Sequence, residues 1–367
     1  MANQLTRYLD GLTAWSRSNT ISQPKTKTIN LALQGGGAHG AFTWGVLDHL
    51  LADGRLTITG ISGASAGAIN AVMLADGLAR GGPEEARKRL AAFWRAVSSN
   101  GDLPPLQRAV ADRLISFFPL ATKPIEAWFD ALSKFASPYE LNPLNINPLR
   151  DLINRFVDFD AVRQSELALF VSTTNVHTGR LRIFPREKIT ADVVIASAAL
   201  PFLFQAVEID GVPYWDGGYL GNPAIFPFLR NTESEDVLVV QINPTVREGT
   251  PRTTREIVNR LNEITFNSAL ISELREIDFA TQLIDEGRLP RGTGDNDYRR
   301  LKVHRIELGG FGRRLTAASR MQTDYEFFAL LFRAGQRAAR RFLDQHYDDI
   351  GQRSTLDLAT EAGVEWA

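Results

Sequence analysis

The feature that most constrains the fold is a strand, glycine-rich turn and helix pattern that occurs twice in succession. Residues 29–34 (INLALQ) predict a buried strand that runs into three glycines, after which apolar residues repeat every fourth position from Phe42 to Leu50. Residues 56–61 (LTITGI) predict a second strand, followed by a turn of small residues and a buried helix over 69–78. Two such units in a row are typical of a parallel α/β sheet with covering helices.

The remaining length extends this core at both ends. Leucines at helical spacing before a proline predict a helical appendage and linker over residues 1–28. Residues 29–230 are predicted to form the main domain, with a lid-like insertion near 101–160. The insertion is rich in proline and in large aromatic residues, among them Phe117, Phe118, Trp128, Phe129 and Phe135. Residues 231–367 are predicted to form a C-terminal strand and helix extension packed on the same fold.

Several further elements are predicted by short-range patterns. Two alternating runs, 167–173 and 181–184, predict paired strands around a Thr-Gly turn, and 237–242 predicts a fully buried strand. Thr253 and Glu256 fit a capping box that opens a long helix, 303–308 predicts a short strand, and apolar spacing from Met321 to Phe342 predicts a final long helix. A helix start is also predicted at Pro83.

Composition excludes several classes of function. The chain has 367 residues, with 41 basic and 42 acidic side chains, so no charge excess favours nucleic acid. Cysteine is absent, which excludes thiol nucleophiles, disulfides and cysteine-ligated metals. No run approaches a membrane-spanning length, and the first residues lack the apolar stretch of a signal peptide. We therefore expect a cytoplasmic protein without a metal or organic cofactor.

The sharpest chemical signal is the sequence Gly63-Ala64-Ser65-Ala66-Gly67 at the second strand-to-helix turn. It matches the G-x-S-x-G nucleophile elbow, in which a serine is lifted on a tight turn that only small neighbours allow. The helix that follows directs its N-terminus, with a partial positive charge, at an oxyanion formed there. A glycine turn that serves packing alone is the alternative interpretation of the pentapeptide.

The second signal is the loop Gly35-Gly36-Gly37-Ala38-His39-Gly40, which follows the first strand. Read literally it matches the dinucleotide-binding pattern G-x-G-x-x-G. That pattern requires an acidic residue about 20 positions further on, at the end of the second strand, and none stands there. We therefore interpret the loop as a source of backbone N–H donors for an oxyanion, and keep a dinucleotide-dependent oxidoreductase as an alternative.

The third signal concerns the base that would activate Ser65. The chain has five histidines, none in the context expected of a catalytic loop, although His39 lies in the glycine loop and deserves testing. A better candidate is Asp216, which follows two aromatic residues and precedes Gly217 and Gly218. A partly desolvated aspartate there gains the proton affinity that a general base needs. A turn aspartate bonded to backbone N–H groups is the alternative.

These three motifs, in this order, resemble the patatin-like phospholipases of bacterial type, and the segment 196–201 (ASAALP) resembles the pattern of that family too. The resemblance covers about residues 29–230. It implies a three-layer α/β/α sandwich with a mostly parallel central sheet, here with a C-terminal helical extension. It also implies a serine nucleophile and an aspartate base without a catalytic histidine. The family usually has Arg or Lys where this chain has His39.

Carried onto this chain, the resemblance gives each site residue a role. Ser65 and Asp216 are the expected catalytic dyad. The remaining residues are the expected oxyanion-hole donors Gly35, Gly36, Gly37 and Ala66, and the motif-supporting residues Ala38, His39, Gly40, Gly63, Gly67, Gly217 and Gly218. No metal ligand is expected.

The predicted function is hydrolysis of acyl-lipid esters, such as those of phospholipids or lysophospholipids, through an acyl-enzyme. A thioesterase or transacylase of the same fold, and a non-catalytic membrane or granule scaffold, remain alternatives. The expected partner is an acyl lipid, with peripheral membrane contact through the aromatic insertion and no nucleic acid. The sequence leaves the oligomeric state open.

Overall fold

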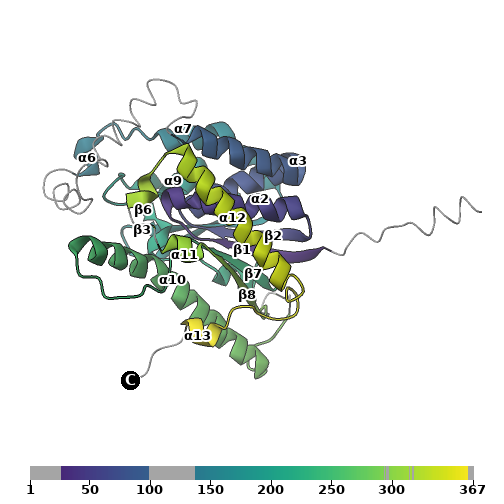
Figure 1. The fold of residues 1–367 in the computed structure, drawn as a ribbon. Helices are drawn as coiled ribbons and strands as arrows, with labels where there is room; N and C mark the ends of the chain where they lie inside the picture. Colours follow the sequence, from purple (N-terminus) through teal and green to yellow (C-terminus); the bar gives the residue numbers. More distant parts are fainter. Residues whose placement is uncertain are drawn as a thin grey trace, which may run out of the picture.

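Within the described residues, the sheet at the centre of the molecule has eight strands and is covered by helices on both faces (Figure 1). The computed structural model describes residues 26–98, 137–292, 294, 297–313, 315 and 318–362. The expected helix near the N-terminus and the five aromatic residues of the expected lid lie outside the described residues. The three-layer α/β architecture with a mostly parallel sheet is as predicted.

The strand order is β5-β6-β3-β2-β1-β7-β8, with β4 paired to β3 beside this path. Five strands, β3, β2, β1, β7 and β8, run parallel to one another. The bounds are β1 (Lys27–Leu33), β2 (Leu56–Gly63), β3 (Ala168–Asn175), β4 (Leu181–Pro185), β5 (Val207–Ile209), β6 (Val212–Asp216), β7 (Asp236–Gln241) and β8 (Lys302–Glu307).

Antiparallel strands close one side of the sheet. The predicted pairing of two strands around residue 178 is confirmed, because β4 runs antiparallel to β3. The hairpin of β5 and β6 was not predicted from the sequence, since its strands have three and five residues and little alternation. β6 pairs with β3 so that Asp216 lies opposite Thr173. This hairpin therefore carries Asp216 to the carboxyl end of the central strands.

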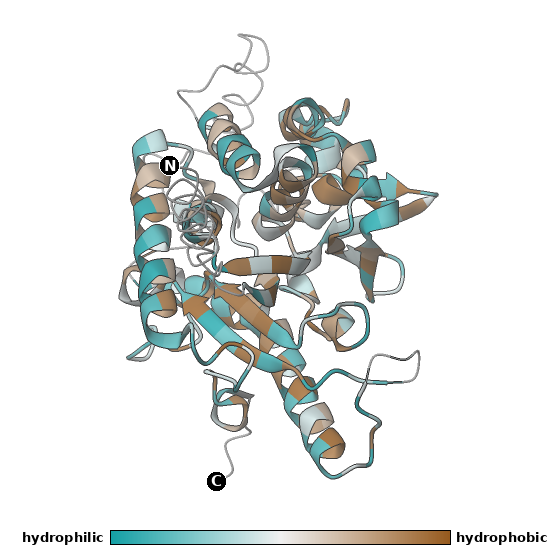
Figure 2. Ribbon diagram, turned by 90° about the vertical axis from the view of Figure 1, so that its right-hand side faces the viewer, coloured by the Kyte–Doolittle hydropathy of each residue, from teal (hydrophilic) through white to brown (hydrophobic). Residues whose placement is uncertain are grey.

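Alternating side chains divide the core between the two faces of the sheet. Ile29, Leu31 and Leu33 of β1 join the larger cluster, whereas Ala32 joins the smaller one. In Figure 2 the strands between the helix layers are mostly apolar in colour, as expected of parallel strands buried on both faces. The larger cluster packs under α2 (Gly40–Asp53), α3 (Ala66–Ala96) and α12 (Tyr325–His346), and the smaller under α10 (Thr254–Asp285) and α13 (Leu358–Ala362).

The remaining helices are short. They are α6 (Pro138–Leu141), α7 (Pro148–Phe156), α8 (Phe159–Gln164), α9 (Ala191–Ser197), α11 (Gly309–Gly312) and the 3-10 turns η1 (Gly37–His39), η2 (Arg186–Lys188), η3 (Gly217–Tyr219), η4 (Phe226–Leu229) and η5 (Ala318–Met321). The predicted helix start at Pro83 coincides with a break inside α3, where Gly82 has φ 73°. The capping box that opens α10 is confirmed.

The last long helix begins later than its apolar spacing predicts. Asp324 caps α12 by accepting a hydrogen bond from Phe327 N–H, so Met321 belongs to η5 instead of the helix. α12 crosses α2 at very close range, because Cβ atoms added at Gly45 or Gly335 would collide with the backbone of the other helix. β7 lies directly beside β1, so residues after 230 complete the same sheet. The domain limits themselves remain a prediction.

Candidate functional site

Ser65 lies on the tight turn between β2 and α3. Its backbone has φ 53° and ψ −124°, a conformation that residues with a side chain rarely adopt and that stores strain. Small neighbours make the turn feasible. A Cβ added at Gly63 would stand 2.7 Å from Ala68 N, and one at Gly67 would collide with the carbonyl oxygen of Leu33. The requirement for glycine at both positions is therefore steric.

The segment at the end of α9 holds both Ser65 and Asp216 in place. Ser65 N–H donates a hydrogen bond to Ser197 Oγ (2.9 Å), and Ser197 is fully buried. Two residues further on, the carbonyl oxygen of Ala199 accepts a hydrogen bond from Asp216 N–H (3.0 Å). One short segment thus fixes the serine turn and the aspartate strand relative to each other. The sequence showed this segment only as part of the family resemblance, without a role for Ser197.

Asp216 ends β6 as a buried carboxyl, with 1% of its surface exposed. Its Oδ1 accepts a hydrogen bond from Gly218 N–H (2.7 Å). Burial raises the pKa of Asp216 to about 7, against the lowering effects of the Gly218 N–H, the Ser65 hydroxyl and the charge of Arg320. Asp216 Oδ2 has no hydrogen-bond partner among the described residues, although the Ser65 hydroxyl lies near enough to lower the pKa of the carboxyl.

The paired glycines after Asp216 allow two close approaches. A Cβ on Gly217 would collide with the backbone of Ser172 in β3, and one on Gly218 would stand 2.6 Å from the ring of Phe266 in α10. Glycine at these positions lets the chain turn sharply after β6, so that Gly218 N–H faces the Asp216 carboxyl.

The glycine loop is fixed by asparagines at its first residue. Gly35 N–H donates to Asn222 Oδ1 (2.7 Å), and the carbonyl oxygen of Gly35 accepts from Asn243 Nδ2 (3.0 Å). The N–H of Gly35 is thus engaged inside the protein. Gly37 and Ala66 differ, because each begins a helix, where the first N–H groups have no acceptor within the helix.

The other motif residues of this loop pack around the same point. Gly37 has φ 57°, and a Cβ there would collide with the carbonyl oxygen of Arg320. Gly40 leaves room for Ala66, whose Cβ would be 2.7 Å from an added Cβ. Ala38 is buried and lines the cavity described below. The loop, the serine turn and η5 are thus in contact.

His39 does not form a catalytic triad with Ser65 and Asp216. Its ring is buried, and Nε2 is 2.8 Å from Ser319 Oγ. Burial and the charge of Arg320 lower its pKa to about 3, so the ring stays neutral at physiological pH. All five histidines lie in the described ranges and none lines the cavity beside Ser65.

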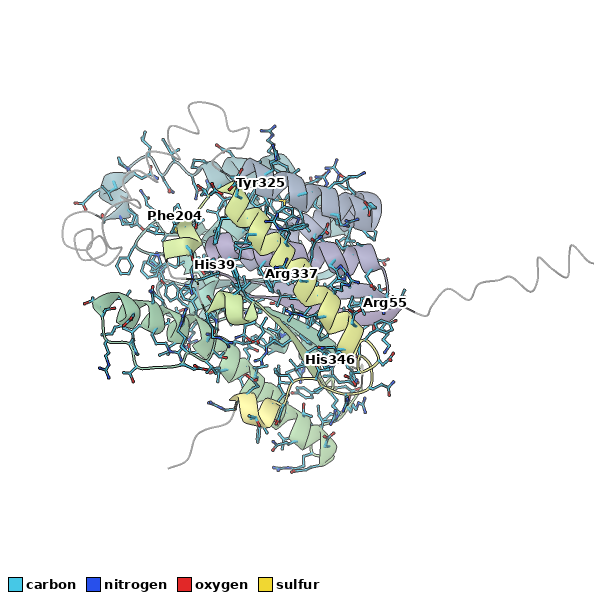
Figure 3. All side chains as sticks on the ribbon, in the orientation of Figure 1. His39, Arg55, Phe204, Tyr325, Arg337 and His346 are labelled. Carbon is cyan, nitrogen blue, oxygen red and sulfur yellow. The ribbon has the colours of Figure 1, made fainter. Side chains whose placement is uncertain are left out.

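A cavity of about 490 Å³ opens at these residues. Ser65, Asp216, Gly36, Gly37 and Ala66 line one part of it, and most of the remaining wall is apolar. The apolar wall includes Ile69, Phe93, Trp94, Val97, Leu149, Leu200, Leu203, Phe204, Phe266 and Phe328. Figure 3 shows His39 and Phe204 on the side of the molecule where α12 begins. Such a cavity suits a molecule with a long apolar part and one reactive polar group.

Four functional candidates were not found from the sequence: Ser197, Asn222, Asn243 and Arg320. Each contacts a motif residue or lines the cavity, but comes from a segment at least 130 positions away from Ser65. An isolated asparagine or arginine has no local pattern that distinguishes it from a surface residue. The only available signal was the family-like segment that contains Ser197.

Two absences hold for the described part of the chain. No helix there is long and apolar enough to cross a bilayer. No group of three or more His, Asp or Glu side chains is arranged to hold a metal ion within those residues either.

The structure thus combines a mostly parallel α/β sheet with a strained serine at a strand-to-helix turn and a buried aspartate that lines the same cavity. The family model "Patatin-like phospholipase" matches residues 31–229, which is more than half of the chain. The chain therefore belongs to the patatin-like phospholipase family, whose members are lipid acyl hydrolases.

Solved structures with some similarity include VipD from Legionella pneumophila (18% identity, TM-score 0.38, covering 88% of this chain and 67% of that one). Another is ExoU in its complex with SpcU from Pseudomonas aeruginosa (17% identity, TM-score 0.37, covering 89% and 53%). This chain thus spans about half of the ExoU chain. A search among curated proteins found no match.

Proposed function

We propose that this protein hydrolyses acyl-lipid esters through a Ser65–Asp216 dyad. The observation that carries the proposal is the meeting of the two residues at the wall of the apolar cavity, with Ser65 on a strained turn and Asp216 buried at a pKa of about 7. A carboxyl with that pKa is matched to proton transfer near neutral pH. Membership of a family of lipid acyl hydrolases supports the same reaction.

The reaction proceeds in two steps. As the Ser65 hydroxyl oxygen attacks the ester carbonyl, its proton passes to Asp216, and the bond to the alcohol breaks as that proton moves on to the leaving alkoxide. A water molecule then gives a proton to Asp216 and attacks the acyl-enzyme, which releases the fatty acid and returns the proton to Ser65. The N–H groups of Gly36, Gly37 and Ala66 stabilise the oxyanion. Gly35 N–H donates to Asn222 and is left out of this set.

The test uses a decanoyl glycerol ester and a fluorophosphonate probe that labels activated serines. We expect Ser65→Ala and Asp216→Asn each to lose at least a thousandfold in kcat, and Ser65→Ala to lose all labelling. Asp210→Asn is the matched control, since Asp210 lies exposed in the turn that precedes the same strand. Activity retained in either dyad variant would refute the mechanism, and absence of labelling in the unaltered protein would favour the scaffold alternative.

The acceptor of the acyl group defines the second question. A thioesterase or transacylase would use the same dyad with a different leaving group or acceptor. Comparing decanoyl-coenzyme A with the glycerol ester, and adding glycerol as a competing acceptor, separates these three outcomes by product. Water is the acceptor that needs no further binding site, which favours hydrolysis over a transacylase, and membership of a family of lipid acyl hydrolases favours an ester over a thioester.

We also propose that lipid reaches the cavity from a membrane surface. On α10, Ile257, Leu261 and Ile264 are 42, 57 and 50% exposed, and the adjacent Val258 and Asn262 line the cavity. Exposed apolar residues at the edge of a lipid-binding cavity favour interfacial contact. Leu261→Asp is expected to reduce co-sedimentation with phospholipid vesicles, relative to Leu261→Gln. Equal partitioning of the unaltered protein and both variants would contradict this contact.

A further inference from the structure

Among the described residues, the cavity wall contains one permanent positive charge, that of Arg320. Asp216 and Arg320 are the charged residues among those that line it, and the phenol of Tyr219 stays neutral because burial raises its pKa to about 12. Arg320 belongs to η5, outside the residues that match the family model. Its carbonyl oxygen packs against Gly37, and its side chain lies near enough to both His39 and Asp216 to shift the pKa of each.

The guanidinium of Arg320 is incompletely partnered. Nη2 donates a hydrogen bond to Asn243 Oδ1 (2.6 Å), and the group lies 5.3 Å from the ring centre of Phe266. Nε has no hydrogen-bond partner within the described ranges, although it is shielded from solvent. No carboxylate of the described residues lies within ion-pair distance of Arg320. The neighbouring arginines Arg247 and Arg260 differ in this respect, because both pair with Glu263.

An unpaired cation in such a cavity has a physical consequence. The protein surrounds much of the guanidinium, and burial lowers its pKa, yet the residue keeps some exposed surface where it lines the cavity. When an acyl chain fills the cavity it displaces water, and the cost of burying the guanidinium is then offset only in part by the carboxylates of Glu263 and Asp216, which act on it from beyond ion-pair distance. A neutral lipid would leave that cost in place. A ligand with an anionic oxygen group would offset it, since a guanidinium has five N–H donors directed at such oxygens.

From this geometry we propose that Arg320 selects acyl lipids that carry an anionic oxygen group close to the ester. The inference rests on the proposed ester hydrolysis and adds the charge of the substrate. The recognised chemistry is a phosphate or carboxylate oxygen, supplied either by the headgroup of the lipid or by the fatty acid that the reaction releases. Arg320 is a specificity-determining residue in this assignment, because it contacts the ligand away from the bond that breaks.

A matched substrate pair tests the selection. 1-Decanoylglycerol 3-phosphate and 1-decanoylglycerol share the acyl chain and ester and differ in the phosphate, and both are assayed below their critical micelle concentrations by release of decanoate. We expect the ratio of kcat/KM for the phosphate ester over the neutral ester to fall about tenfold or more in Arg320→Gln, as expected for loss of a charge-assisted hydrogen bond. Arg320→Lys should recover part of the ratio.

The control is Arg313→Gln, which removes an equal charge from an exposed arginine of the same segment that does not line this cavity. We expect it to leave the ratio unchanged. The proposal is overturned if Arg320→Gln lowers kcat/KM for both substrates in parallel, or if the unaltered protein shows no preference for the phosphate ester. Melting temperatures of all variants identify a general loss of folding.

A binding arm separates this proposal from the proposed function and distinguishes the two sources of the anion. Ser65→Ala protein is titrated calorimetrically with decyl phosphate, decanoate and 1-decanol, with and without Arg320→Gln. Loss of decyl phosphate binding in the double variant supports headgroup recognition, whereas loss of decanoate binding alone assigns the site to the released acid and overturns selection of the substrate. Equal binding of all three ligands in both proteins refutes the anion site. Absent fluorophosphonate labelling of the unaltered protein refutes the Ser65–Asp216 dyad instead.

Discussion

Replacing Asp216 by asparagine should abolish activity and at the same time stabilise the folded protein at neutral pH. The carboxyl is buried, and burial raises its pKa from 3.8 to about 7. Between these two pH values the folded state holds a proton that the unfolded chain releases. The free energy of unfolding therefore falls as the pH rises through this window, and levels off above about pH 7. Asparagine has a similar shape and no charge, so the variant escapes this loss.

The magnitude follows from the shift. About three pKa units, at about 1.36 kcal/mol each, correspond to about 4 kcal/mol at pH 8. The stronger hydrogen bond that the carboxylate accepts from Gly218 N–H is already contained in that pKa, so it is not subtracted again. With an unfolding entropy of about 2.1 cal/mol/K per residue, a gain of about 4 kcal/mol corresponds to a rise in melting temperature of roughly 5 °C.

The assay is thermal unfolding of both proteins from pH 4 to pH 8.5, supplemented by urea titrations at the two ends of the range. The difference in stability should be small near pH 4, where the folded state is protonated and the unfolded chain is about half protonated, and should grow steadily to pH 7. Asp210→Asn, in the exposed turn of the same hairpin, should show no such pH dependence. A constant difference across the range, or a destabilised variant at pH 8, would refute the account of Asp216 as a desolvated carboxyl.

Three further outcomes are expected. In the unaltered protein kcat/KM should rise about tenfold per pH unit up to about pH 7 and then level off, because Asp216 must be deprotonated to act as a base. A pH profile of kcat/KM that is flat between pH 5 and 7 argues against that role. Ser197→Ala should lower the rate of fluorophosphonate labelling of Ser65 about tenfold or more, because the hydrogen bond that holds the serine turn is lost. Circular dichroism should show that the variant stays folded. An unchanged labelling rate would show that Ser197 does not position Ser65. Gly67→Ala should lower the free energy of unfolding by about 3 kcal/mol or more in urea titration, because the added Cβ would collide with the backbone of Leu33. Gly54→Ala is the control: it has open space and φ 73°, so it should lower the free energy of unfolding by only about 1 kcal/mol. Similar losses at both sites would contradict the steric requirement of the serine turn.

The sequence determined the elements that depend on neighbours in the chain. The strand, turn and helix units around residues 29–78 could be predicted because periodicity and small residues act locally, and the same holds for the capping box at Thr253. Ser65 was singled out for the same reason, since a tight turn requires its small residues to be adjacent. The family-like order of the motifs predicted a meeting of Ser65 with Asp216 across 151 positions.

Tertiary structure alone decided what distant segments contribute. The β5–β6 hairpin that positions Asp216 is too short to produce a periodic signal in the sequence. Its place in the sheet is set by the pairing of β6 with β3. The sequence predicted Gly35 N–H as a donor for an oxyanion, but in the folded chain this N–H donates a hydrogen bond to Asn222 Oδ1. The pKa of Asp216 depends on burial by several elements, and the charge in the cavity comes from Arg320, 255 positions beyond the serine. Hydrogen bonding, desolvation and charge act over a few ångströms in space, and the sequence does not state which residues come that close.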